Sequence, residues 1–351
     1  MFHTVELYYQ LDKEQFNTLY PRGYPLRNSR TRRIRNDHLY ECGIARIDVW
    51  QKDYINYCLS CVINLPKLAA CGARVSYIDL ATEADIPAVK ATFAMLMRDF
   101  PELPEDIDEW TVKRMDYAIN IRVGKTLATL YPALLNRGKP RGGTADRDEH
   151  DNSYSYANGS WGYNIYDKEA ETVRTDDDPW SIWNRPDLTD VERIRYHMDA
   201  DGILRIEAQY GKRKLYSYLK QNTQDTKRTL SALAKNDIAM DELRKAVSYI
   251  SPDIPYRSRR ETEIRIRSTE HRESTKEQMC SFVNELSMKR SHSEMAKFHK
   301  EHNRLVQLMV KDGINPVALR DTEVKEIQSE ELEPLCRVLE RQIALVEMWK
   351  D

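Results

Sequence analysis

The sequence contains no apolar run long enough to cross a membrane and no signal peptide at its start. A membrane span takes about 18 or more consecutive apolar residues, and no such run occurs. The opening residues, Met-Phe-His-Thr-Val-Glu-Leu, have neither the basic region nor the apolar core of a secretory signal. Charged residues are 31% and hydrophobic residues 41% of the chain, a balance typical of globular proteins. These features predict a cytoplasmic protein without a membrane partner.

Two common motifs for metal and nucleotide binding are incomplete. Cys58 and Cys61 form a C-x-x-C pair, but no second pair completes a zinc site. The pair also lies on a predicted strand, where residues three apart face opposite sides. Gly124-Lys-Thr126 resembles the end of a phosphate loop, yet Ile119 stands where that loop needs a glycine. We therefore expect the cysteines to be small buried residues, and we do not predict an ATPase.

The net charge of −2 does not indicate nucleic-acid binding. Local clusters of basic residues are a better indication of it. Such clusters can neutralise DNA phosphates, although a solvated surface explains them equally well. One cluster spans residues 27–35, a second spans residues 257–267, and a third occupies residues 212–214. The candidate DNA contacts in the first and third clusters are Arg32, Arg33, Lys212, Arg213 and Lys214.

The chain changes character near residue 223. Alternating apolar and polar residues predict strands over 3–10, 37–50, 54–65, 111–122, 153–157, 162–167 and 202–210. Helical periods are interspersed there, and residues 27–35 are expected to form a loop. After residue 223, helical periods dominate over 226–249, 272–288, 292–312 and 331–349. We predict an α+β protein with a strand-rich domain over 1–222 and a helical domain over 223–351.

Three of the predicted strands share a pattern of polar residues on one face. On two of them an arginine stands two residues before an acid, so both side chains point the same way. Mixed polar faces are also ordinary on solvent-exposed sheets. If the strands are neighbours, however, one face carries carboxylates, a tyrosine and several cations. The residues are Arg114 and Asp116, Arg205 and Glu207, and Asn164, Tyr166 and Lys168.

These groups suit the cleavage of a phosphodiester bond. A tyrosine has a pKa of about 10, so it becomes a useful nucleophile only beside a cation or a metal. Asp116 and Glu207, with Glu171 as a further candidate, offer hard oxygen ligands for Mg²⁺ or Mn²⁺. Tyr166 would attack the phosphate, and Lys168 would stabilise the developing charge. Tyr216 and Tyr218 are weaker rivals, because their neighbours include no carboxylate.

The same segments resemble rolling-circle replication initiators of the filamentous-phage type and the related plasmid and conjugative-element initiation factors. Those families show R-[IL]-D on one strand, then Y-x-K-x-x-E, then R-[FI]-E. Here the motifs read Arg114-Met-Asp116, Tyr166-Asp-Lys168-Glu-Ala-Glu171 and Arg205-Ile-Glu207, in the same order and with similar spacing. The resemblance covers residues 1–220 well and the remainder loosely.

The resemblance implies an antiparallel-sheet catalytic domain that nicks DNA through a tyrosine. Tyr166 matches the nucleophile, Asp116 and Glu207 match acidic positions that we assign to the metal, and Glu171 matches a further acid. No His-hydrophobe-His strand is present, which is the metal motif of the wider superfamily, so carboxylates would replace it. Whether Glu171 or Glu169 joins the metal is open. Arg114 and Arg205 complete the candidate DNA contacts.

The expected function is therefore a metal-dependent, origin-specific nickase that forms a 5′-phosphotyrosine bond and later rejoins the strand. Its expected partners are origin DNA in single-stranded or hairpin form, a host helicase with the replication machinery, and a second copy of the chain. A conjugative relaxase would use the same chemistry in another setting. The sequence is also compatible with a DNA-binding regulator that lacks catalysis and with a purely structural protein.

Overall fold

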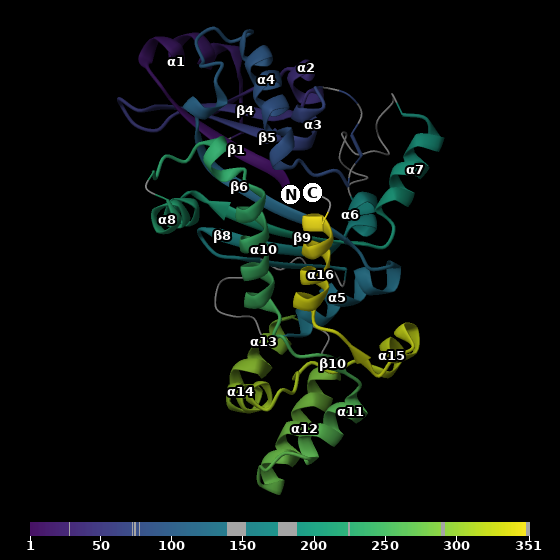
Figure 1. Ribbon diagram of the computed structural model, residues 1–351. Coiled ribbons are helices and arrows are strands. Elements are labelled where there is room, and N and C mark those ends of the chain that lie inside the picture. Colours follow the sequence, from purple (N-terminus) through teal and green to yellow (C-terminus); the bar gives the residue numbers. More distant parts are fainter. Residues whose placement is uncertain are drawn as a thin grey trace. The chain divides into compact units, whose positions relative to one another are not determined.

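The computed structural model describes residues 1–27, 29–71, 73, 75–76, 78–138, 152–174, 188–223, 225–288 and 292–348 (Figure 1). It confirms the α+β class, with a large antiparallel sheet and a helical region after residue 223. Within the described residues, none of the helices has both the length and the apolar character that a membrane crossing requires.

Among the described residues, the main sheet has nine strands in the order β2-β3-β4-β5-β1-β6-β9-β8-β7. Strands β6, β9 and β8, which carry the three motifs, are thus neighbours. A separate two-stranded sheet pairs β10 with β11. The strand bounds are β1 Phe2–Leu11, β2 Tyr24–Pro25, β3 Thr31–Ile34, β4 Ile44–Gln51, β5 Tyr57–Asn64, β6 Thr111–Arg122, β7 Ser153–Ala157, β8 Trp161–Asp167, β9 Ile203–Gly211, β10 Tyr256–Arg257 and β11 Glu331–Leu332.

Chain contacts divide the protein into two compact units. The first unit comprises residues 1–119, 159–162 and 207–242, and the second comprises residues 120–158, 163–206 and 243–351. Strands β6, β8 and β9 and helix α10 each continue from one unit into the other. The units therefore follow spatial contacts and not the change of composition at residue 223, so that boundary stays a prediction.

The first unit buries one face of its sheet under short helices. Helices α1 and α3 contact β1 and β5, and α3 also contacts α4 (Figure 1). Strand β1 pairs with β5 so that Leu7 lies opposite Cys61, and both side chains are fully buried. The helices wholly in this unit are α1 Lys13–Leu19, α2 Asp37–Glu41, α3 Leu65–Ala69, α4 Ile86–Met97, α8 Lys212–Asn222 and α9 Leu230–Leu233.

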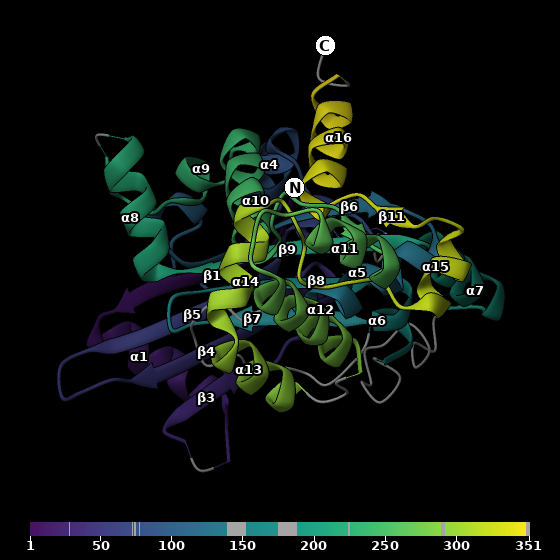
Figure 2. The same cartoon turned by 90° about the horizontal axis from the view of Figure 1, so that it is seen from below.

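The second unit contains most of the helices. Helix α5 contacts β7, α13 and α15, while α11 lies against α12 (Figure 2). Helix α10, Asn236–Ile250, is shared with the first unit. The other helices are α5 Lys125–Arg137, α6 Lys168–Arg174, α7 Asp190–Ala200, α11 Arg259–Arg267, α12 Glu273–Met288, α13 His292–Glu301, α14 Asn303–Lys311, α15 Asp321–Ile327 and α16 Leu335–Met348.

Several local predictions of helices, strands and loops were wrong. Residues 37–41 form α2 and not the start of a strand, because the Asn36 side chain accepts a hydrogen bond from Leu39 and caps a helix. The segment 27–35 contains β3, which pairs with β4. The helix predicted over 292–312 is two helices that meet at His302.

Gly202 stands directly before β9, and its backbone contacts the residues that follow β6. It has a φ of +66°, and its carbonyl accepts hydrogen bonds from Val123 and Gly124 at 2.9 and 3.1 Å. A Cβ at this position would lie 2.9 Å from the Cα of Gly124. Neither the backbone conformation nor the space therefore suits a side chain.

We expect Gly202→Ala to lower the free energy of unfolding by about 2–3 kcal/mol, because the left-handed conformation and the backbone contact both penalise a Cβ. Urea denaturation measures the change. Gly159→Ala is the matched control, since a Cβ there meets no atom within 4 Å. A Gly202 variant as stable as that control would contradict this account of the junction.

Candidate active site

Two buried carboxylates form one candidate group of functional residues, within the first unit. Asp116 on β6 is 2% exposed and Glu207 on β9 is 6% exposed. Arg114 holds Asp116 in a two-point contact, with Nε 2.7 Å from Oδ1 and Nη2 2.6 Å from Oδ2. Burial raises the pKa of Asp116 to about 6, against the hydrogen bond and charge of Arg114, and Glu207 and Glu6 raise it further. Burial is thus the main reason why Asp116 holds its proton more tightly than an exposed aspartate does.

The pH dependence of stability tests this buried acid. An unfolded aspartate titrates near pH 4, so the folded protein holds the Asp116 proton more tightly than the unfolded chain does. The stability from this group is therefore complete below about pH 4 and is lost as the pH rises through about 6.

Relative to Asp116→Asn, wild-type protein in EDTA should lose about 2 kcal/mol of unfolding free energy between about pH 4.5 and about pH 7.5. Urea denaturation of the two proteins at both pH values measures this difference. If the difference between wild type and variant does not change with pH, the folded pKa of Asp116 is not raised.

Tyr166 and its neighbours form a separate candidate group, within the second unit. Tyr166 is the penultimate residue of β8 and is half-buried, and Lys168 is the first residue of α6. The Lys168 ammonium lies 5.7 Å from the centroid of the Tyr166 ring and 2.6 Å from Oε2 of Glu171. Lys168 is only 3% exposed. A buried cation is thus held beside the tyrosine by a carboxylate of its own helix.

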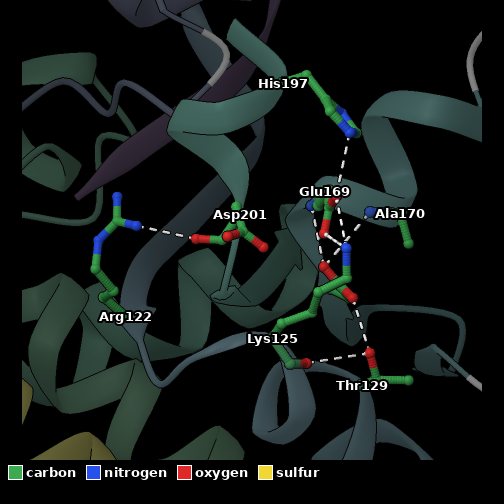
Figure 3. A network of polar contacts seen from close by, with 8 residues as sticks. Arg122, Lys125, Thr129, Glu169, Ala170, His197 and Asp201 are labelled. Carbon is green, nitrogen blue, oxygen red and sulfur yellow. Dashed lines mark hydrogen bonds and ion pairs between the residues drawn. The ribbon is translucent and has the colours of Figure 1, made fainter. Parts of the chain in front are cut away.

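The junction between β8 and α6 is anchored by side chains on both sides of it (Figure 3). Asp167 accepts hydrogen bonds from the backbone N–H groups of Glu169 and Ala170 at 3.0 and 3.4 Å, which caps α6. Thr129 of α5 donates to Oδ2 of Asp167 at 3.0 Å. Burial raises the pKa of Asp167, although these hydrogen bonds oppose the rise. The residue between Tyr166 and Lys168 is therefore fixed by two elements.

Glu169 gives the same junction a further anchor. Its carboxylate lies 3.0 Å from Lys125 Nζ and 3.1 Å from His197 Nε2, and Figure 3 shows both side chains pointing toward it. Glu169 therefore holds α5 and α7 to α6, whereas Glu171 contacts Lys168. We had not predicted the roles of Asp167, Glu169 or His197. An aspartate directly before a helix was the one available signal, because such residues cap helices.

The predicted DNA-contacting arginines differ widely in exposure. Arg205 is fully buried, and its Nε donates to Asn120 Oδ1 at 2.7 Å. This burial gives Arg205 a structural role in place of the predicted DNA contact. Arg114 is engaged by Asp116, as described above. Arg33 makes a two-point contact with Asp48, at 2.7 and 3.2 Å.

Of the remaining predicted contacts, two are half-buried and two are exposed. The Arg32 guanidinium lies 4.6 Å from the centroid of the Tyr20 ring. Lys212 and Arg213 are exposed in the first turn of α8. Lys214 is half-buried, 3.8 Å from Glu242. Lys212 and Arg213 are thus the most accessible of the predicted cations.

The predicted metal ligands fit a divalent cation only as a partial set. Asp116 and Glu207 offer hard oxygen donors, although Arg114 is hydrogen-bonded to both oxygens of Asp116. The carboxylate of Glu171 is likewise hydrogen-bonded to Lys168. Among the residues that the structure describes, no three or more His, Cys, Asp or Glu side chains are grouped to hold a metal. Mg²⁺ is often bound by one or two carboxylates together with substrate phosphates. Two buried acids therefore suit a metal that arrives with a phosphate.

Comparison with protein-family models and with curated proteins finds no match to the chain.

Proposed function

We propose that the protein is a rolling-circle DNA replication initiator that nicks one strand of its origin through Tyr166. The observation that carries the proposal is the buried ammonium of Lys168 beside the Tyr166 ring. A cation in that place favours negative charge on the ring, as a tyrosine nucleophile requires. The order β6-β9-β8 supports the proposal further, because it makes the three motif-bearing strands neighbours.

In the proposed reaction, the phenolic oxygen of Tyr166 forms a bond to the phosphorus while the bond from phosphorus to the 3′ oxygen breaks. The phenol loses a proton and the 3′ oxygen gains one, so the products are a 5′-phosphotyrosine and a free 3′ hydroxyl. Lys168 stabilises the phenolate, and Glu171 orients Lys168. Reversal of the same step rejoins the strand.

Asp116 and Glu207 are the residues that we assign to Mg²⁺ or Mn²⁺. The bound ion would polarise the phosphate and neutralise charge on its oxygens. Arg114 keeps Asp116 in place through its two-point contact. This function would place the protein in the cytoplasm, with origin DNA as substrate and with a helicase, the replication machinery or a second copy as partners.

A nicking assay on supercoiled origin plasmid with Mn²⁺ tests the proposal. We expect relaxed DNA and a protein–DNA adduct that survives SDS. A protein that binds origin DNA but never cleaves it would support a non-catalytic regulator instead. Cleavage at a transfer origin, and not at a replication origin, would support a conjugative relaxase.

The metal assignment makes a separate prediction. Asp116→Asn and Glu207→Gln should each reduce metal-dependent cleavage by roughly 100-fold or more, because each removes a charged oxygen ligand. Asp48→Asn is the matched control, since Asp48 is also a buried acid held by an arginine of the same unit. It should cleave at the wild-type rate. Full activity in either test variant would remove that residue from the ligand set.

A further inference from the structure

Helix α11 carries three exposed arginine side chains that make no ion pair within the described part of the chain. Arg260, Arg265 and Arg267 are exposed, and none forms an ion pair with any residue that the structure describes. Two other arginines of the same unit, half-buried Arg244 and exposed Arg337, differ in this respect. Arg244 lies 3.0 Å from Glu340, and Arg337 lies 3.0 Å from Asp253. The positive charge on α11 is thus available to a partner.

Two of these arginines flank an exposed isoleucine on one face of the helix. Arg260, Ile264 and Arg267 are spaced i, i+4 and i+7, so they lie in one row. Thr262 and Ile266 are buried, whereas the Ile264 side chain is 50% exposed. A face that served only solvation would not need an apolar residue at its centre. We call Arg260, Ile264 and Arg267 the α11 row.

The α11 row sits on a firmly held helix. Ser258 caps its start by accepting a hydrogen bond from the backbone N–H of Glu261. Asn284 of α12, which lies beside α11 (Figure 1), donates to Glu263 at 3.0 Å. After the helix, His271 lies 2.7 Å from Asp312. Glu263, the acid nearest to the row on the helix surface, accepts this hydrogen bond, and within the described residues it makes no ion pair with Arg260 or Arg267.

We propose that the α11 row binds double-stranded DNA, with α11 lying in the major groove. This inference rests on the proposed function, because it takes DNA as the substrate. It adds to the protein a surface that binds duplex DNA, in addition to the residues that would cut one strand. The major groove admits an α-helix. Seven helical residues rise about 10.5 Å, which is close to three base-pair steps of about 3.4 Å each. Arg260 and Arg267 then reach phosphates or guanine edges, and Ile264 meets thymine methyl groups.

Fluorescence anisotropy on a labelled, short, mixed-sequence duplex tests the proposal with the full-length protein in EDTA. Arg260→Gln with Arg267→Gln should weaken duplex binding at least about tenfold. The slope of log affinity against log salt should fall by about 1.8 in magnitude if both arginines contact phosphates. The control, Arg244→Gln with Arg337→Gln, removes the same charge from arginines that are already paired, and should change affinity less than about twofold.

Equal duplex affinity of the α11 double variant and wild type would overturn the proposal. An equal loss in the control variant would also overturn it, since the effect would then come from net charge alone. Arg260 and Arg267 are exposed, so the α11 double variant should unfold at the same urea concentration as wild type, which excludes a folding defect. The control variant removes surface ion pairs and should lose about 1 kcal/mol per pair or less.

A second measurement separates this inference from the proposed function. The α11 double variant should still form the Tyr166 adduct with a single-stranded copy of the origin. If the adduct forms but duplex affinity is unchanged, the α11 proposal fails and the nickase remains. If no adduct forms with any origin DNA but duplex binding still depends on Arg260 and Arg267, the nickase proposal fails and the α11 surface remains.

Discussion

Replacing Tyr166 with phenylalanine is expected to abolish the SDS-resistant protein–DNA adduct. Phenylalanine keeps the ring beside Lys168 but removes the oxygen that would bond to phosphorus. Strand cleavage should fall by roughly a thousandfold or more, because loss of a covalent nucleophile leaves only the surrounding binding and charge stabilisation. The far-UV circular dichroism spectrum should not change, since Tyr166 is only half-buried at the end of its strand.

The controls for this experiment are the rival tyrosines of α8. Tyr216→Phe and Tyr218→Phe should form the adduct at the wild-type rate, because neither belongs to the β8–α6 junction. Mass spectrometry of the adduct after nuclease digestion identifies the modified residue. An adduct that persists in Tyr166→Phe would show that another residue is the nucleophile, and the digestion would name it.

Replacing Arg137 with alanine is expected to cause a large loss of stability. Arg137 is the last residue of α5, and its side chain is 5% exposed. Nη2 lies 2.9 and 2.8 Å from the two carboxylate oxygens of Glu323 on α15. Burial lowers the pKa of Arg137, and the charge of Glu323 opposes that effect. Without the guanidinium, Glu323 is left as a nearly buried, uncompensated charge.

Removing one partner of a buried ion pair typically costs about 3–5 kcal/mol, and urea denaturation should show a loss of that size for Arg137→Ala. Arg341→Ala is the control: Arg341 also pairs with a glutamate, Glu333, but its side chain is 63% exposed. We expect it to lose about 1 kcal/mol or less. Arg137→Met with Glu323→Gln should recover most of the stability, because no charge remains buried. Similar losses in both alanine variants would refute the role of burial.

The sequence alone predicted the strands that carry the candidate site. Alternation over residues 111–122 and 202–210 has the period of a strand, and it correctly placed Asp116 and Glu207 within β6 and β9. The Asn-Ile-Tyr-Asp segment correctly indicated a strand that runs directly into a helix. These signals are local, since they depend only on which side of a strand each residue takes.

Local signals failed where a side chain overrode the expected pattern. The residues after Asn36 were predicted to form a strand, but the Asn36 cap favours the short helix α2. The Asp167 cap was overlooked in the same way, although it fixes the residue beside Tyr166. In both cases hydrogen bonds between a side chain and the backbone determine where a helix begins.

By itself, the sequence determined the α+β class, the helical character after residue 223, and the residues that share a strand face. Only the tertiary structure decided that β6, β9 and β8 are neighbours, since strand pairing joins segments far apart in the chain. It also decided what each polar face meets. Alternation shows that Arg205 and Glu207 point the same way, but not that Arg205 is fully buried against Asn120. Alternation with a period of two specifies the face of the sheet on which each side chain lies. Whether that side chain is buried depends on what packs over the face.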